Sequence, residues 1–279
     1  MKKLVVGNFV CCLLFLLTGV STSLADGLLL TNVRVLDVES GEISEESDVR
    51  ISGGEISEIG TSLESKENEE SIDLSGKFLL PGLMDLHSHL LLHPYDEATW
   101  NDQVLKESLG LRTIRGTVHA RKTLEAGFTT IRELGTEGAG FADVAIRDAI
   151  NRGMIPGPRV LTATRALVTS GGYGPSGFDP RFNIPKGAQQ ADGVGEVRRA
   201  TREQIAAGAD WIKVYADYRR QSGGGSTPTF SEEELKAIVD EANSAGVPVS
   251  AHATTDKGIK RAVKAGAVSY THLTLPTKA

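Results

Sequence analysis

The spacing of hydrophobic and polar residues along this chain changes near Pro81. In residues 28–59, apolar and polar positions alternate over short stretches such as Val33-Arg34-Val35, and Gly and Ser interrupt them. This pattern is typical of half-buried β-strands joined by turns, so residues 26–80 are predicted to form a small β unit. Residues 66–71 are polar and charged, and we expect a surface loop there.

After Pro81, strand-like apolar runs alternate with stretches of helical spacing. Residues 141–152 are predicted to form a helix. Four of its apolar residues are expected on the buried face: Val144, Ala145, Ala149 and Ile150. Ser231 and Glu234 have the spacing of a capping box and predict the start of another helix, which the strand Val247–His252 follows. Alternating strands and helices indicate an α/β fold with a parallel sheet.

The first 25 residues have the features of a cleaved signal peptide. Two lysines precede an apolar run at residues 9–17, and Ser23-Leu24-Ala25 offers a small-residue cleavage site. We therefore expect a mature chain that begins near Asp26, is periplasmic or secreted, and has no membrane association. The alternative is an uncleaved anchor, but the apolar run is short for a span of about 30 Å of hydrocarbon.

Composition narrows the chemistry that the mature chain can perform. The 279 residues are 40% hydrophobic and 24% charged, an ordinary globular mixture. The net charge of −6 argues against a nucleic-acid partner and favours a small-molecule substrate. Both cysteines lie in the predicted signal peptide. Any metal site must therefore use histidine, carboxylate or a modified lysine.

Two histidines end the apolar run that begins near Leu79. His87 and His89 are separated by one residue, so their side chains point to the same side of a strand. If that strand lines a barrel, both imidazoles reach its mouth and can bind one metal ion. The alternative is a pair of surface histidines that follow the Pro81-Gly82 turn.

Lys213 is the second unusual residue, because it interrupts an otherwise apolar strand pattern at residues 211–215. An unpaired buried ammonium is costly, and burial lowers the pKa of a lysine. The resulting neutral amine can react with carbon dioxide to give a carbamate, whose two oxygens suit divalent cations. The alternative is a lysine that reaches solvent or pairs with Asp210 or Asp217.

Other candidate residues follow from their positions in the chain. His252 ends a predicted strand, where a metal ligand is expected, although a core histidine is the alternative. Tyr173 and Tyr215 are candidate substrate contacts, with packing as the alternative role. His93 and His119 have no partner at ligand spacing, and we expect them to be structural or exposed.

These segments together resemble the amidohydrolase superfamily, whose members are metal-dependent hydrolases built on a (β/α)8 barrel. The resemblance runs from about Leu28 to about Ser269 and is greatest for the branch of Xaa-Pro dipeptidases and imidazolonepropionase-like hydrolases. It implies an incomplete (β/α)8 barrel over residues 81–269, preceded by the N-terminal part of a β-sandwich. The segments that carry it resemble barrel strands one to five in order: 79–89, 127–135, 157–161 with the loop 169–174, 208–214 and 249–253.

The resemblance also implies a site and a reaction. His87, His89, His252 and a carboxylated Lys213 would help to bind one or two Zn²⁺ ions, or another divalent metal, that activate water for attack on an amide. Small amides are the expected substrates, for example dipeptides with C-terminal Pro. A cyclic amide such as imidazolonepropionate is one alternative, and a non-catalytic periplasmic barrel protein is another. An oligomer is compatible with the sequence.

The last ten residues, 270–279, depart from the family pattern. The family expects a sixth strand that ends in Ile-Glu-His-Gly, and His272 has the spacing of that metal ligand but lacks the flanking Glu and Gly. A coincidental histidine is the alternative, because this tail resembles translated adaptor sequence. The family's general-base aspartate belongs to the eighth strand and would lie beyond Ala279. We therefore expect a truncated chain that is inactive by itself.

Overall fold

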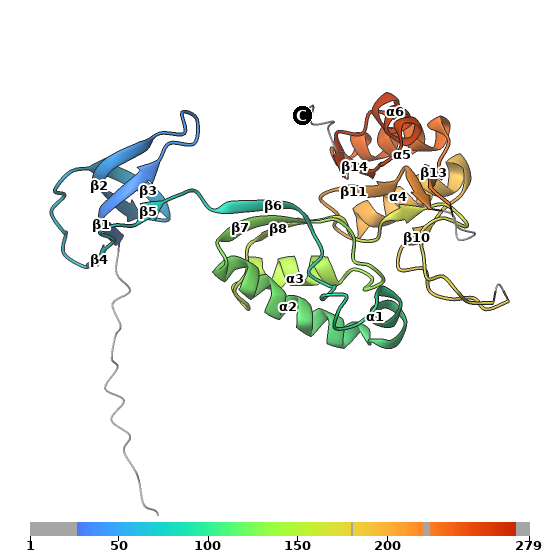
Figure 1. The fold of residues 1–279 in the computed structure, drawn as a ribbon, viewed down its shortest axis with the longest axis horizontal. Coiled ribbons are helices and arrows are strands. Elements are labelled where there is room, and N and C mark those ends of the chain that lie inside the picture. The colour runs from blue at the N-terminus through green and yellow to red at the C-terminus, as the bar shows by residue number, and fades with distance from the viewer. Residues whose placement is uncertain (1–26, 180, 220–223, 272–279) are drawn as a thin grey trace, which may run out of the picture. The chain divides into compact units, whose positions relative to one another are not determined.

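The computed structural model describes residues 27–179, 181–219 and 224–271. The predicted signal peptide and His272 lie outside the described residues. The chain divides into two compact units, Met1–Pro81 and Gly82–Ala279 (Figure 1). Among the described helices, none is both long enough and apolar enough to cross a membrane.

The first unit is a five-stranded sheet. Its strands are β1 (Gly27–Leu36), β2 (Ile43–Ser52), β3 (Glu55–Gly60), β4 (Glu69–Asp73) and β5 (Phe78–Leu79). β1 pairs antiparallel with β2 and parallel with β4 and β5, and β2 pairs with β3. Leu30, Val33 and Val49 form the buried centre, as the alternating pattern predicts.

The predicted loop at residues 66–71 is wrong from Glu69 onward, where β4 begins. The side chain of Glu69 turns inward because its carboxylate accepts a hydrogen bond from Arg50 Nε at 2.8 Å. This ion pair crosses from β2 to β4, two strands that do not follow one another in sequence. β4 forms because its backbone pairs with β1, and the Arg50–Glu69 ion pair accommodates one of its charged side chains in the interior.

The second unit contains six parallel barrel strands. They are β6 (Leu83–Ser88), β7 (Phe128–Glu133), β8 (Arg159–Thr162), β11 (Ile212–Tyr215), β14 (Val249–His252) and β15 (Ser269–Thr271). β6, β7 and β8 pair in one sheet, and β11, β14 and β15 pair in a second that also holds the short strands β9 (Leu167–Val168) and β10 (Gln189–Gln190). A hairpin of β12 (Asp217–Arg219) and β13 (Ser226–Pro228) follows β11.

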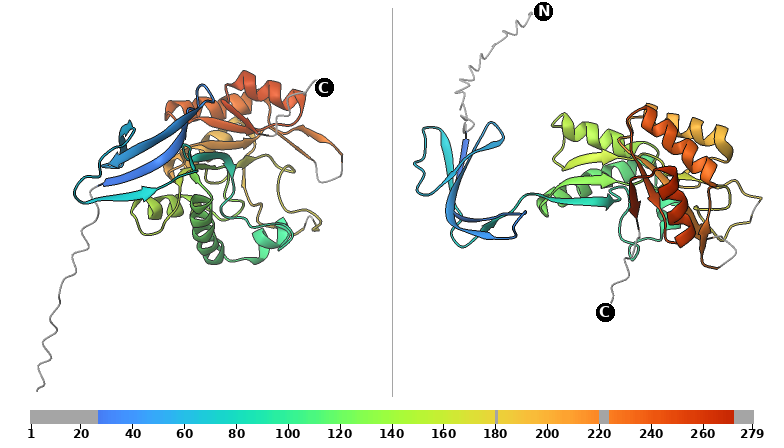
Figure 2. Two further views of the ribbon diagram at one scale, coloured as in Figure 1. Left: turned by 60° about the vertical axis from the view of Figure 1, so that its left-hand side comes forward. Right: turned by 90° about the horizontal axis from the view of Figure 1, so that it is seen from above.

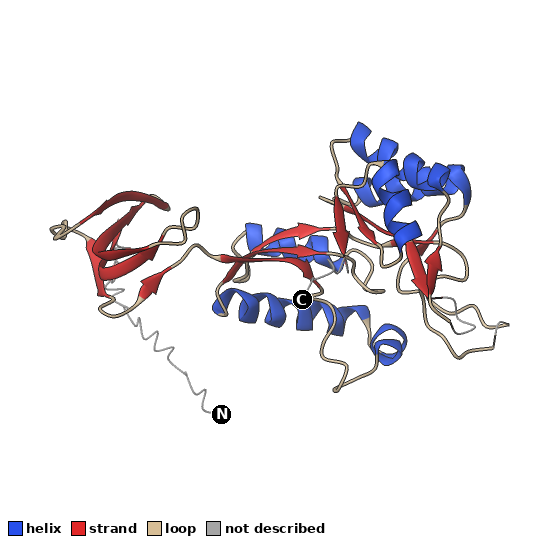
Figure 3. Ribbon diagram, turned by 45° about the horizontal axis from the view of Figure 1, so that its top comes forward, coloured by secondary structure: helices blue, strands red, loops and turns tan. Residues whose placement is uncertain are grey.

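Helices separate these strands (Figure 3). They are α1 (Trp100–Lys106), α2 (Leu109–Glu125), α3 (Ala142–Asn151), α4 (Gly193–Ala206), α5 (Glu232–Ser244) and α6 (Asp256–Ala265). α4 packs against α5 and α5 against α6 along the second sheet (Figure 2). The strand and helix alternation is that of an incomplete (β/α)8 barrel, so the predicted fold class is confirmed.

Polar contacts join the two sheets of this unit. The backbone amides of Asp210 and Trp211 donate to the carbonyl of Thr162 at 2.8 and 3.0 Å, which brings β11 beside the end of β8. Arg132 on β7 is buried, and its Nη2 donates to Ser269 Oγ on β15 at 2.9 Å. Arg132 therefore links the second barrel strand to the sixth.

Two helices, α5 and α3, can be compared with the predictions made from the sequence pattern. The capping box predicted for Ser231 and Glu234 is present at the start of α5. The buried face predicted for α3 is wrong in part, because Ala145 is exposed and Ile146 is buried. The buried side of α3 also carries Asp143, whose Oδ2 accepts from the Thr164 amide at 2.8 Å. A polar contact with the loop after β8 therefore helps to set the rotation of the helix.

Candidate active site

His87 and His89 lie at the carboxyl end of β6. Their ring centroids are 5.2 Å apart and the planes are 66° from one another. His89 Nδ1 lies 3.1 Å from the carbonyl oxygen of Gly135. Because a carbonyl only accepts, Nδ1 carries the proton and Nε2 keeps its lone pair. A ligating histidine is commonly oriented in this way.

Two carboxylates fix the backbone around this histidine pair. Asp85 Oδ1 accepts from the amide of His87 at 2.9 Å. Glu133, fully buried on β7, accepts from the amide of Leu90 at 2.6 Å. Burial raises the pKa of the Glu133 carboxyl well above its usual range. These contacts hold both ends of the His87–His89 segment.

Lys213 is 1% exposed in the middle of β11. Its Nζ donates to Thr271 Oγ1 on β15 at 3.1 Å and lies 5.5 Å from the ring centre of Tyr215. Burial lowers the pKa of this amine from 10.5 to about 7, an effect that nearby Glu137 opposes and Arg132 reinforces. Near neutral pH the amine is therefore uncharged in a substantial fraction of molecules.

The carboxylates that sequence reasoning offered as partners for Lys213 are engaged elsewhere. Asp210 pairs with Arg147 at 2.9 Å. Asp217 accepts hydrogen bonds from the backbone amides of Thr254 and Thr255, at 2.9 and 2.7 Å, and from both hydroxyls. A salt bridge with either aspartate, the alternative considered for Lys213, is therefore wrong.

His252 lies at the end of β14, in register with Tyr215 on the neighbouring strand. The two rings are stacked, with centroids 4.8 Å apart and planes 26° from one another. Its Nε2 is 3.8 Å from Asp217 Oδ1. Asp217 therefore positions both His252 and the loop that follows it.

One cavity of about 730 Å³ collects most of the predicted site residues. His87, His89 and His252 line it, together with Tyr173 and Tyr215. Tyr173 belongs to the glycine-rich loop after β9, and its ring stacks on Tyr215 at 4.5 Å. Residues from β6, β11, β14 and a distant loop thus meet around one volume large enough for a small-molecule ligand.

The remaining histidines have structural contacts. His93 is buried, and its ring nitrogens lie 2.8 and 2.9 Å from the carboxylates of Glu97 and Glu107. His119 Nδ1 lies 2.8 Å from the carbonyl oxygen of Leu90. These contacts agree with the structural role expected for both.

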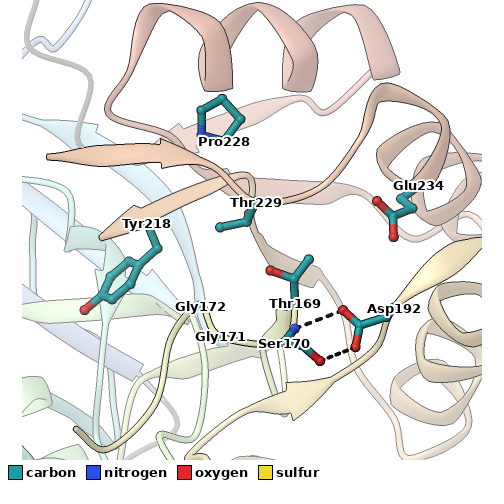
Figure 4. Close-up of a pocket in the computed structure, with 9 residues that line it drawn as sticks. All are labelled: Thr169, Ser170, Gly171, Gly172, Asp192, Tyr218, Pro228, Thr229 and Glu234. Carbon is teal, nitrogen blue, oxygen red and sulfur yellow. Dashed lines mark hydrogen bonds between the residues drawn. The ribbon is translucent and has the colours of Figure 1, made fainter. Parts of the chain in front are cut away.

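A second cavity of about 260 Å³ lies near the loop after β9 (Figure 4). Its polar groups are engaged with each other and with helix ends. Ser170 donates to Asp192 through its amide at 2.9 Å and its hydroxyl at 2.5 Å. Glu234 accepts from the amides of Gly193 and Ser231. These contacts fasten the loop to the start of α4, and the start of α4 to α5.

Comparison with known proteins agrees with this arrangement. The sequence profile of the amidohydrolase family matches residues 78–279. This chain belongs to the amidohydrolase family. The match begins just before β6 and includes every barrel strand described above.

Relatives of this family member include hydrolases. An ochratoxinase of Aspergillus niger is 36% identical over 217 residues, which cover 70% of this chain and 43% of that protein. Among solved structures, a prolidase complexed with N-methylphosphonate-L-proline has a TM-score of 0.76 and 33% identity, over 88% of this chain and 60% of that chain. A Xaa-Pro dipeptidase with bound methionine has a TM-score of 0.75 and 32% identity, over 88% of this chain and 61% of that chain. The chain thus spans less than half of the curated relative's length.

Amidohydrolases are in general dependent on a divalent metal, and three histidines that could act as ligands line the cavity. Imidazole nitrogens are good ligands for zinc, and His89 already has the tautomer that leaves Nε2 for a cation. Among the described residues, no three His, Cys, Asp or Glu side chains converge closely enough to hold an ion. His272 lies outside the described residues.

Sequence reasoning missed several residues of the cavity. Trp100, Glu137 and Tyr218 line it, and Asp217 anchors its edge. None carries a local motif: Trp100 starts a short helix and Glu137 lies in a loop. The one available signal was the aromatic and acidic pattern Tyr215-Ala216-Asp217-Tyr218 directly after Lys213.

Proposed function

We propose that the full-length protein is a metal-dependent hydrolase of carbon–nitrogen bonds in small amides, with dipeptides that end in Pro as the favoured substrates. The observation that carries this proposal is the single cavity lined by His87, His89 and His252, next to a buried lysine whose pKa is about 7. Similarity to a prolidase and to a Xaa-Pro dipeptidase supports the substrate class.

The metal site would be built from four side chains. His87, His89 and His252 would supply imidazole nitrogens, and Lys213 would supply carbamate oxygens. The carbamate forms when the neutral Nζ adds to carbon dioxide and one nitrogen-bound proton leaves to solvent. When bound, one or two Zn²⁺ or other divalent ions would acidify water and polarise the amide carbonyl.

The chain's own residues prepare this site. The Gly135 carbonyl sets the tautomer of His89, and Asp217 holds the strand end at His252. Tyr173 and Tyr215 cover one side of the cavity and would exclude water from the substrate. By family resemblance, an aspartate of the eighth barrel strand would accept the proton of the attacking water and pass it to the leaving nitrogen.

Two other substrate classes should be compared directly with X-Pro dipeptides. The similarity to an ochratoxinase makes an ochratoxin the second candidate. Imidazolonepropionate represents the cyclic amides. A non-catalytic barrel protein would hydrolyse none of these compounds and would have no need of a metal.

The test is a substrate panel on the protein expressed from its complete reading frame. X-Pro dipeptides, dipeptides without Pro, an ochratoxin and imidazolonepropionate would be assayed with Zn²⁺ and with a chelator. We expect fastest turnover of X-Pro dipeptides, loss with chelator, and a fall of about 10²-fold or more in the His89→Ala variant. His119→Ala is the matched control and should retain activity, since His119 lies outside the cavity. Chelator-resistant turnover, or equal loss in both variants, would contradict the proposal.

A further inference from the structure

Four aromatic side chains form a continuous wall of the large cavity. Tyr173 stacks on Tyr215 at 4.5 Å, and Tyr218 meets these two rings edge-on at 5.1 and 5.5 Å. Trp100 meets Tyr173 edge-on at 5.0 Å. All four line the cavity. Ring faces are electron-rich and attract cations, most strongly where water is excluded.

Glu137 lies within this wall and is 4% exposed. Its Oε2 accepts from Trp100 Nε1 at 2.8 Å and from the hydroxyl of Tyr173. Two of the aromatic side chains therefore hold this buried carboxylate in place at the cavity wall.

The backbone at Glu137 is constrained to present this side chain. Its φ is +52°, in the left-handed region that few residues other than glycine adopt. Buried Arg112 donates to the Glu137 carbonyl at 2.7 Å and to the Thr136 carbonyl at 3.2 Å, and so stabilises that conformation. Strained residues of this kind concentrate at ligand-binding sites.

Charge in the cavity is distributed between two residues. Of the described residues that line it, Glu137 is the only carboxylate and Arg219 the only lysine or arginine. Glu137 is buried, whereas Arg219 is exposed. A dipeptide carries one ammonium and one carboxylate, so these two residues match its two ends in number and in sign.

We propose that Glu137 and the rings of Trp100, Tyr173 and Tyr218 bind the protonated free amine of the substrate, while Tyr215, stacked between Tyr173 and His252, supports these rings. This inference rests on the proposed hydrolase function and narrows it: the enzyme takes amides whose acyl part carries a cationic amine and rejects N-acylated counterparts. Glu137 and the rings select the substrate, and they take no part in bond cleavage.

Binding can be measured without turnover, in metal-free protein. The chain has two tryptophans. Trp211 packs under Arg132 and does not line the cavity, so in the 279-residue chain Trp211→Phe leaves the fluorescence of Trp100 as the reporter. This protein would be titrated with Ala-Pro and with N-acetyl-Ala-Pro. We expect Ala-Pro to bind at least about 10-fold more tightly; equal affinities would overturn the inference.

Two variants separate recognition from structure. Glu137→Gln keeps an oxygen that can accept from Trp100 and Tyr173 but removes the negative charge. It should lower the affinity for Ala-Pro by about 10-fold and leave the affinity for N-acetyl-Ala-Pro unchanged. Tyr218→Phe keeps the aromatic ring and should bind both ligands with the affinity of the parent protein. Tyr218→Leu should bind Ala-Pro several-fold more weakly, with no change for N-acetyl-Ala-Pro. Equal loss for both ligands in Glu137→Gln would show a purely structural carboxylate and would overturn the inference.

Steady-state kinetics with both substrates distinguish an error in the amine site from an error in the proposed hydrolase function. In the full-length metal-loaded enzyme, kcat/KM for Ala-Pro should exceed that for its N-acetyl form, with most of the difference in KM. If no amide is hydrolysed but the binding preference persists, the hydrolase function is wrong and the amine site stands. If both substrates are hydrolysed equally well, the amine site is wrong and the hydrolase function stands.

Discussion

Replacement of Lys213 by Met should stabilise the metal-free protein, although Lys213 is central to the proposed site. A pKa of about 7 in place of 10.5 means that the folded protein disfavours the charged amine. Each tenfold change in proton affinity is worth about 1.4 kcal/mol, so the penalty on the ammonium is on the order of 5 kcal/mol. Met removes the charge and keeps the length, but leaves Thr271 Oγ1 without its donor, which costs about 1 kcal/mol.

The sign of the pH dependence follows from proton binding. Unfolded Lys213 holds its proton more tightly than folded Lys213, so the free energy of unfolding of the natural sequence rises with pH between about 7 and 10.5. Below that window the penalty is complete. Lys213→Met should therefore be more stable by about 3–4 kcal/mol near pH 6 and by about zero near pH 9.5.

The assay is urea unfolding of chelator-treated protein, followed by tryptophan fluorescence at both pH values. Lys257→Met is the matched control, because Lys257 is exposed on α6 and should change stability little at either pH. If Lys213→Met is destabilised equally at the two pH values, then Lys213 is not a buried titrating amine and the proposed route to its carbamate loses its basis.

Three further predictions concern the rest of the chain. Arg132→Met removes the hydrogen bonds to the Leu86 carbonyl and Ser269 Oγ and the stacking of the guanidinium on Trp211. It should lower the free energy of unfolding by about 2 kcal/mol. The control Arg121→Met, on the exposed side of α2, should leave the free energy of unfolding unchanged. Burial raises the pKa of Asp143 from 3.8 to about 6. The contribution of its protonated carboxyl to the free energy of unfolding is therefore complete below pH 3.8 and should decline by about 3 kcal/mol as the pH rises to 6. Urea unfolding of Asp143→Asn across this pH range should show no such decline. N-terminal sequencing of protein expressed in a bacterium should return a start near Asp26, and an intact Met1 would refute export by a cleaved signal peptide.

Local patterns in the sequence were sufficient for the strands that carry the predicted site. The His87–His89 pair, Lys213 and His252 each stand out within a few residues, because a polar group in or at the end of an apolar strand is visible without knowledge of the fold. The capping box at Ser231 is local in the same sense. The strands β6, β11 and β14 could therefore be placed from the sequence, and with them the α/β class.

Contacts between distant segments could not be predicted in this way. Glu137 becomes part of the cavity because Trp100 and Tyr173, 37 and 36 residues away, both donate to it. Asp217 became an anchor because Thr254 lies beside it once β11 and β14 pair. The face of α3 was misjudged for the same reason, since its rotation depends on a contact between Asp143 and a later loop.

The proposed hydrolase requires a divalent metal, held by His87, His89, His252 and Lys213, for amide hydrolysis by the full-length protein. The most direct measurement is metal content by elemental analysis beside turnover of an X-Pro dipeptide, as the chelated protein is titrated with Zn²⁺. We expect activity to rise with bound zinc and to level off at one or two ions per chain, with metal and activity lost together in Lys213→Ala. Full turnover at negligible metal content, or stoichiometric zinc with unchanged turnover in Lys213→Ala, would contradict the account.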